Sequence, residues 1–164
     1  MKERSITQQL NRTLMIICAI ILALMAVFAN WQVIGRYLLS SPPGWTDEVL
    51  RFMLIWLTMI GAPLAHGMNR SMLVTFFVDR MSERNKLKNS IFVECLVILF
   101  AIVVLIIGGL IYSKIGWNVI SASIGIRMTW VYMSLPVSGV LFVIYSFSKI
   151  KLSIAKLKDM SGGM

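Results

Sequence analysis

Of the 164 residues, 58% are hydrophobic and only 14% are charged, whereas roughly a quarter of the residues in a soluble domain carry charge. Together with a mean hydropathy of +0.81, this composition indicates an integral membrane protein. The net charge of +9 does not indicate a nucleic-acid binder, because the Lys and Arg residues lie between long apolar runs rather than on one solvated face. Cys18 and Cys95 fall inside apolar runs, which predicts buried thiols rather than a disulfide.

Four stretches of the chain are long and apolar enough to predict an all-α integral membrane protein, formed as a single membrane domain over residues 1–164. The predicted transmembrane helices cover about residues 14–39, 48–66, 90–113 and 129–150. The first stretch is longer than the core of a signal peptide and lacks a clean cleavage site behind it, so we interpret it as a retained span. Pro63 is expected to kink or end the second helix.

The segment 71–81, between the second and third spans, has a different pattern. Ser71, Thr75 and Asp79 recur every four residues, and apolar residues fill most of the remaining positions. A helix with one polar stripe that is too short to span a bilayer is typical of the membrane interface. We therefore predict an interfacial amphipathic helix here.

The distribution of basic residues predicts the orientation. Twelve of the 16 Lys and Arg residues lie in the N-terminal segment, the connection between the second and third spans, and the C-terminal segment from Lys149 onward, which includes the tail 151–164. The other side carries only Arg36, Arg51, Lys114 and Arg127. By the positive-inside rule both termini, and with them the basic tail, are expected in the cytoplasm.

Most Trp and Tyr residues fall toward the outer half of the predicted spans. They form either an interfacial belt of the ordinary kind or, in part, a surface on which another protein docks. The candidate docking residues on this rim are Trp45, Trp117, Arg127 and Trp130.

The stretch 42–51 combines a stiff turn with charged residues. After Pro-Pro-Gly, Thr46 is placed to cap the second helix, and Asp47 and Glu48 occupy its first turn, where the helix dipole favours carboxylates. Arg51 follows at helical spacing and can pair with either carboxylate. With the arginine at the end of the first span, these charges sum to zero, and we predict that they brace the first two helices against each other. The predicted cluster is Arg36, Asp47, Glu48 and Arg51.

Ionisable groups inside the predicted spans are few and lie near span ends: Arg36, Arg51, His66 and Glu94. A self-sufficient carrier holds its solute near the bilayer midplane, so this pattern argues against one. It also argues against catalysis, and it offers neither a metal-ligand cluster nor a substrate site. Glu94 is expected either to reach back to Lys88 or Ser90, or to form a buried ion pair with another subunit. Gly108-Gly109 permits close helix approach, within the chain or between subunits.

Two alternative functions follow from the same composition. Small four-helix membrane anchors often hold haem between histidines, but His66 is the one histidine of this chain, and a solvated or interfacial histidine is the expectation for it. A small exporter or channel that acts alone is the other alternative.

Several motifs together resemble a known family. They are Gly35-Arg36-Tyr37, Pro43-Gly44-Trp45-Thr46-Asp47-Glu48, Arg51, Trp56, Gly61-Ala62, Ala65, Ser121-Ala122-Ser123-Ile124-Gly125-Ile126, Trp130, Tyr132, Pro136 and Gly139. In this order, over roughly residues 10–150, they resemble the small membrane subunit of tripartite ATP-independent periplasmic (TRAP) transporters, the DctQ-like family.

The resemblance implies a sodium-driven uptake system in the bacterial inner membrane. A periplasmic binding protein would deliver an organic anion to a large elevator-type subunit, which the small subunit would scaffold in the lipid bilayer. The substrate and sodium sites would then lie in the large subunit, and no cofactor or nucleic acid is implied for this chain. Trp56 and Glu94 are the candidate residues for contact with the large subunit.

Overall fold

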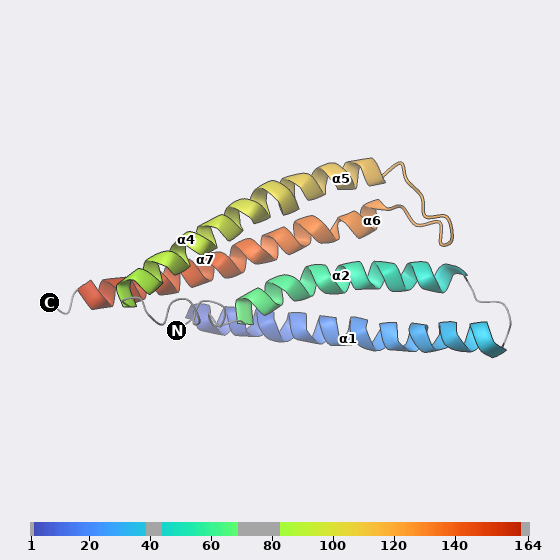
Figure 1. Cartoon of the computed structure of the whole chain (residues 1–164), viewed down its shortest axis with the longest axis horizontal. Helices are drawn as coiled ribbons and strands as arrows, with labels where there is room; N and C mark the ends of the chain where they lie inside the picture. Colours follow the sequence, from blue (N-terminus) through green and yellow to red (C-terminus); the bar gives the residue numbers. More distant parts are fainter. Residues whose placement is uncertain (1, 39–43, 69–82, 162–164) are drawn as a thin grey trace.

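The computed structural model describes residues 2–38, 44–68 and 83–161 of the chain. The third span is built from three consecutive helices without a break, and the fourth from two. The helices are α1 (Lys2–Leu38), α2 (Gly44–Met68), α4 (Glu83–Phe100), the π-helix η1 (Ala101–Gly108), α5 (Gly109–Gly116), α6 (Thr129–Tyr132) and α7 (Ser134–Ser161) (Figure 1). The predicted interfacial helix, 71–81, lies outside the described residues.

Within the described residues, four helical segments are long and apolar enough to cross a membrane, which confirms the predicted all-α architecture. They are Thr7–Tyr37, Gly44–Met68, Leu87–Gly116 and Thr129–Ala155. All four extend beyond the predicted limits at one end or both. In the third and fourth segments the Lys, Leu and Ala residues that flank the apolar runs are themselves good helix formers. For the same reason α7 continues to Ser161, through much of the predicted tail. The 31 residues of the first segment extend about 46 Å, which exceeds the roughly 30 Å of a hydrocarbon core.

Helix α2 differs from the prediction at both ends. It begins at Gly44, so Thr46 lies inside the first turn rather than at the expected N-cap, with its side chain fully buried. Of the two predicted effects of Pro63, a kink or the end of the helix, the second is excluded, because α2 continues past it to Met68. Helices in a membrane tolerate proline, since neighbouring helices and local adjustments compensate the lost backbone hydrogen bond. The Pro63 ring is itself buried in the structure.

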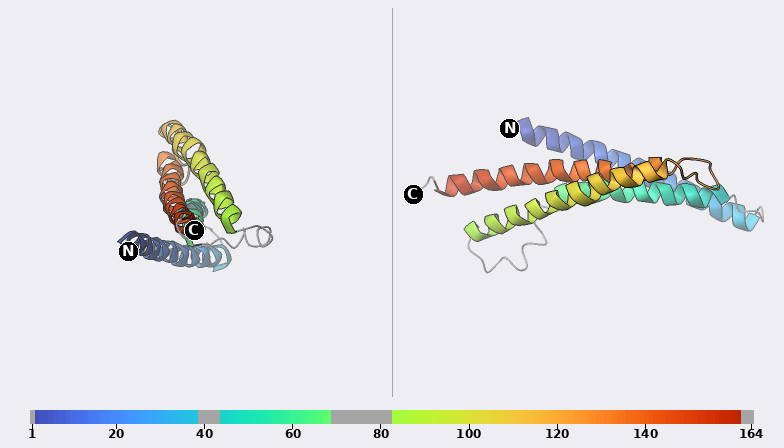
Figure 2. Two further views of the ribbon diagram at one scale, coloured as in Figure 1. Left: turned by 90° about the vertical axis from the view of Figure 1, so that its left-hand side faces the viewer. Right: turned by 90° about the horizontal axis from the view of Figure 1, so that it is seen from above.

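The four spans pack in a row rather than as a closed bundle. Helix α1 packs on α2, α2 packs on α7, and α7 packs on α4 and η1 (Figures 1 and 2). The first turns of α1 and the last turns of α7 lie at one end of the molecule, which we call the terminal end. The loop between α5 and α6 and the chain ends that flank 39–43 lie at the opposite end.

Because the row is open, every span exposes large apolar side chains. In the most apolar window of α1 only 6% of the residues are buried within the chain, compared with 33% in the fourth span. The exposed side chains extend along the whole length of α1, from Met15 and Ile16 to Val33 and Tyr37. In a bilayer these surfaces face lipid or another membrane protein.

The apolar core lies where α1, α2 and α7 meet near the terminal end. Leu14, Ile60, Leu64 and Tyr145 form its buried centre. The Tyr145 hydroxyl donates a hydrogen bond to Asn11 Oδ1 on α1, 2.5 Å away, so the one polar atom of this buried ring has a partner. This arrangement joins the first and last spans.

Glycines bring the third and fourth spans close together. A Cβ added at Gly109 would lie 2.7 Å from Pro136 Cδ, and one added at Gly139 would lie 2.7 Å from Ile106 Cγ1 in η1. At Gly108 the nearest atom would be 3.8 Å away, which is ordinary contact. The expected close approach therefore involves Gly109 and lies within the chain.

Both cysteines are free thiols, as predicted. Cys18 is partly buried beside the core, but Cys95 is exposed on the third span. The expectation of two buried thiols is therefore wrong for Cys95, because the open row leaves that face of α4 uncovered by the described residues.

Candidate functional site

The loop between α5 and α6 forms a small hairpin. An isolated antiparallel bridge pairs Ile120 with Arg127, and the Ser121 N–H donates to the Ile126 carbonyl at 2.9 Å. Gly125 turns the chain with φ +73°, a conformation that glycine adopts without the steric penalty of a Cβ. We call residues 119–128 the hairpin, and the end of the molecule that carries it the hairpin end.

Glu48 connects this hairpin to the start of α2. Its Oε2 accepts a hydrogen bond from the Ser123 N–H at 3.1 Å, across 75 residues of sequence. The prediction placed Glu48 in a charge cluster with the arginines of the first two helices. The structure instead directs the carboxylate to a backbone donor of the hairpin, because that donor lies within reach of the first turn of α2.

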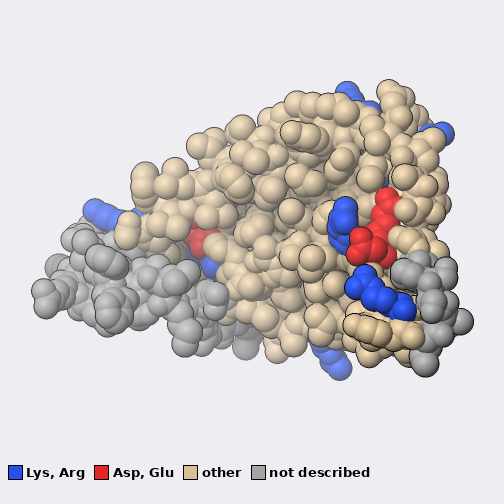
Figure 3. All heavy atoms as spheres, turned by 45° about the vertical axis from the view of Figure 1, so that its right-hand side comes forward, with Lys and Arg blue, Asp and Glu red and all other residues tan. Residues whose placement is uncertain are grey.

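Asp47 and Arg51 do form the predicted pair. The Arg51 Nη2 donates to Asp47 Oδ2 at 3.2 Å, one helical turn away on α2, and the two side chains are 70% and 64% exposed. Exposed pairs of this kind contribute about 0.2–1 kcal/mol at most. Figure 3 shows acidic side chains between basic ones at this end, on a face that otherwise carries few charges.

The predicted bracing of α1 against α2 by charges is not found. Among the described residues Arg36 is exposed and forms no ion pair with Asp47 or Glu48. A guanidinium at a span end can remain solvated, so it does not require an internal partner. The helices are joined here by aromatic packing, since the Phe28 and Trp45 rings meet edge to face at 6.1 Å.

The predicted docking residues are exposed at the hairpin end. Trp117 is 58% and Trp130 is 66% exposed. The Arg127 guanidinium lies over the Trp117 ring, 4.3 Å from its centroid, which is a cation–π contact. Trp45 is 42% exposed but also packs on α1, so part of its surface is used inside the chain.

Trp56 lies on α2 between the core and an open groove. It packs against the buried core of α1, α2 and α7 and lines an apolar groove of about 300 Å³. The groove separates the hairpin from the first two helices. Its lining residues are Ile21, Val49, Phe52, Met53, Trp56, Ile124 and Ile126. This surface is apolar enough for either a lipid chain or a side chain of a membrane partner.

Glu94 has partners that the sequence prediction did not contain. It is only 6% exposed, and its Oε2 lies 3.0 Å from His66 Nε2 on α2. Its Oε1 lies 3.2 Å from Lys149 Nζ on α7, and Ser146 Oγ lies 3.4 Å from the His66 nitrogen. Neither Lys88 nor Ser90 is its partner; the ion pair is internal and joins three helices.

His66 is therefore not freely solvated, because its ring nitrogen is bonded to Glu94 and its side chain is only 22% exposed. Because an ionised carboxylate only accepts hydrogen bonds, the bond to Glu94 assigns the proton to His66 Nε2. This nitrogen is occupied in the present arrangement, so it does not offer the lone pair that a haem iron needs. Within the described ranges no group of three His, Cys, Asp or Glu side chains could hold a metal ion.

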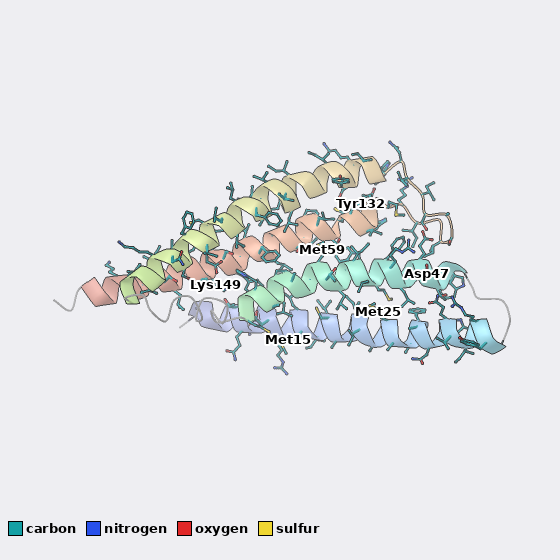
Figure 4. The ribbon with its side chains drawn as sticks, in the orientation of Figure 1. Met15, Met25, Asp47, Met59, Tyr132 and Lys149 are labelled. Carbon is teal, nitrogen blue, oxygen red and sulfur yellow. The ribbon has the colours of Figure 1, made fainter. Side chains whose placement is uncertain are left out.

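Figure 4 places the two polar sites at different ends of the molecule. Asp47 lies at the hairpin end, whereas Lys149 lies toward the terminal end. For the site around Glu94, the sequence shows one His and one Glu in apolar segments. Such groups need polar partners there, so the sequence indicated that a polar site exists. Lys149 was assigned to the cytoplasmic basic side, and so its role as that partner was missed.

Four spans in an open row, with broad apolar faces and a hairpin at one end, define a small multi-pass membrane protein. The comparison with known families then specifies it. The family model described as "Tripartite ATP-independent periplasmic transporters, DctQ component" matches residues 24–155, and the chain belongs to this family. It is thus a transporter component of the inner membrane.

Individual relatives agree with this assignment. The sialic acid TRAP transporter small permease protein SiaQ of Vibrio cholerae is 26% identical over 150 residues, covering 92% of this chain and 86% of the relative. A TRAP transporter small permease protein of Haemophilus influenzae is 29% identical over 140 residues, covering 84% and 85%. The sialic acid TRAP transporter permease protein SiaT of H. influenzae is 23% identical over 112 residues, which are 68% of this chain and 18% of that protein.

Proposed function

We propose that this chain is the small permease subunit of a sodium-driven secondary-active transporter that imports an organic anion. The anion is a C4-dicarboxylate, a sialic acid or a sugar acid, and a periplasmic binding protein delivers it. The names of the V. cholerae and H. influenzae relatives support sialic acid within this set. Both termini face the cytoplasm, and the hairpin end faces the periplasm.

The open row of helices is the observation that best supports the scaffolding role. A closed bundle would satisfy its own apolar surface, whereas this row leaves most of α1 and much of the third span exposed. Such faces suit a large membrane partner that packs along them, because helices associate in lipid by close packing over extended surfaces. The SiaT permease is much larger than this chain, because the matched residues make up only 18% of it. This match supports a relation between the small subunit and a larger permease.

Trp56 remains a candidate for contact with the large subunit, because it lies at an open apolar groove. Glu94 supports the scaffold in another way. Its carboxylate is buried against His66 and Lys149, so it holds the spans together and is not itself a contact residue.

The exposed residues at the hairpin end are the proposed docking surface for the periplasmic binding protein. Trp117, Arg127 and Trp130 present aromatic and cationic groups there. Aromatic residues and arginine are the side chains that contribute most to protein interfaces.

Co-purification tests the proposed function. An affinity tag on this subunit is expected to retain a much larger multi-span membrane protein from solubilised membranes, and transport in liposomes is expected only when both are present with the binding protein. A stable homo-oligomer that transports alone would contradict the proposal. An absorbance spectrum with a Soret band would favour the haem-bearing anchor instead.

A further inference from the structure

The hairpin contacts α2 in two ways. The Glu48 carboxylate accepts the Ser123 N–H, and Ile124 and Ile126 face Val49 across the apolar groove. Because about 300 Å³ of the groove is empty, apolar packing alone does not fix the distance between hairpin and helix. A hydrogen bond to an ionised carboxylate is directional and about twice as strong as a neutral one. The bond to Glu48 is therefore the contact that specifies where the hairpin tip lies.

The other strand of the hairpin carries a cation in a defined orientation. Arg127 pairs with Ile120 in the bridge, and its guanidinium lies 4.3 Å from the centroid of the Trp117 ring. No carboxylate pairs with Arg127 among the described residues. A guanidinium stacked on an indole face keeps its N–H groups at the edge, where they can bind a carboxylate through two parallel hydrogen bonds.

The charges of the hairpin end favour an acidic partner. Four basic residues, Arg36, Arg51, Lys114 and Arg127, stand against Asp47 and Glu48 in this part of the sequence. Asp47 is already paired with Arg51, and Glu48 is bonded to the hairpin. A surface with surplus cations attracts a partner that carries carboxylates and steers its approach.

We propose that Glu48 is a positioning residue for docking, because its bond to Ser123 holds the hairpin so that Arg127 meets a carboxylate of the periplasmic binding protein. This inference rests on the proposed function, since the binding protein is its partner. Glu48 itself does not touch that protein. It acts through Arg127. Because Glu48 restricts the hairpin to fewer conformations, less conformational entropy is lost when Arg127 binds the carboxylate of the binding protein.

The first experiment measures the hairpin without the binding protein. The complex of both membrane subunits in lipid nanodiscs is treated with trypsin, and cleavage after Arg127 is followed by mass spectrometry. Glu48→Ala is expected to raise the cleavage rate about tenfold over the unmodified chain, because loss of a charge-assisted hydrogen bond makes local opening more frequent. Asp47→Asn is the matched control: it removes the same charge one residue away and leaves the rate unchanged.

The second experiment measures binding of the periplasmic binding protein to the same nanodiscs. Glu48→Ala is expected to raise Kd about tenfold and Glu48→Gln about threefold, whereas Asp47→Asn, which changes the surface charge by the same amount, does not raise Kd. If Glu48 acts through Arg127, the Glu48→Ala change has no further effect on Kd in the Arg127→Ala background. A role in overall stability alone would instead give additive effects.

The outcomes separate this inference from the proposed function. The positioning role would be overturned if Glu48→Ala changed Kd equally in the unmodified chain and in the Arg127→Ala background. It would also be overturned if Glu48→Ala changed neither the cleavage rate nor Kd. Faster cleavage with an unchanged Kd would also overturn it, because the hairpin would then lie outside the docking surface. If the unmodified complex binds no binding protein, the proposed docking fails as well, and the trypsin result alone then reports the attachment of the hairpin.

Discussion

His66 on α2 lies 3.0 Å from the carboxylate of Glu94 on α4, although α7 stands between these two helices in the row. Lys149 of α7 completes the arrangement at 3.2 Å from the other carboxylate oxygen. The cluster thus joins three spans that are otherwise held together by pairwise packing. In lipid, where apolar surfaces do not drive helices together, such polar contacts help to specify which helices are neighbours.

Glu94→Gln is expected to destabilise the chain. The amide keeps the size of the side chain but leaves Lys149 with an uncompensated charge in a largely buried site, and breaking one side of a buried ion pair is strongly unfavourable. We expect a loss of about 2 kcal/mol in the free energy of unfolding, since Lys149 keeps some exposure. Unfolding by SDS titration in mixed micelles measures it.

A compensating variant serves as the control for this prediction. Replacing Glu94 by Gln and Lys149 by Met together removes the pair, and well-packed apolar substitutes for a buried pair are often neutral. The double variant is expected to regain most of the lost stability. If it is as unstable as Glu94→Gln alone, the carboxylate does not act through Lys149.

Gly139→Ala is expected to loosen the contact between the third and fourth spans. The added Cβ would lie 2.7 Å from Ile106 Cγ1 and 3.1 Å from the Ala101 carbonyl oxygen, so the helices must separate. Overpacking of this kind costs about 1–3 kcal/mol. Gly108→Ala is the control, because its nearest atom would be 3.8 Å away and alanine favours helix. Equal thermal midpoints for both variants in detergent would show that the close approach at Gly139 is not maintained.

Hydropathy was sufficient to predict the four spans, because the cost of placing polar backbone and charges in lipid is a property of each segment alone. The lateral order of the spans could not be predicted in this way. All four are apolar enough to span a bilayer, and hydropathy contains no information on which helix packs on which. The sequence left open whether Pro63 kinks or ends α2 for a related reason, since its neighbours and not its own sequence decide whether a kinked helix continues.

At the candidate site, local spacing predicted local contacts only. Asp47 and Arg51 are four residues apart on one helix, and that pair was found. Glu48 and Glu94 bind partners 75 and 28 residues away, and such contacts depend on how the helices are arranged. The position of Glu94 inside an apolar segment indicated that a partner exists, but not which residue it is.

Asp47→Asn is expected to change stability by about 0.5 kcal/mol or less, because the Asp47–Arg51 pair is exposed and lies within a single helix. The small effect is itself informative, since a brace between α1 and α2 would give a large one. Phe28→Ala provides the contrast. It removes the edge-to-face contact with Trp45 that joins the two helices, and we expect it to lower the unfolding free energy several times more than Asp47→Asn does.

Tyr145→Phe tests whether the first span is held to the last by a hydrogen bond in the core. The Tyr145 hydroxyl donates to Asn11 Oδ1, and the ring is 1% exposed, so the substitution preserves the packing and removes only this bond. We expect a loss of about 1 kcal/mol in the free energy of unfolding. Tyr112→Phe is the matched control, because Tyr112 is 58% exposed on the third span. In the Asn11→Ala background the Tyr145→Phe change should have little further effect, since the bond is already absent. An effect that stays the same size there would mean that the hydroxyl stabilises the fold through another contact.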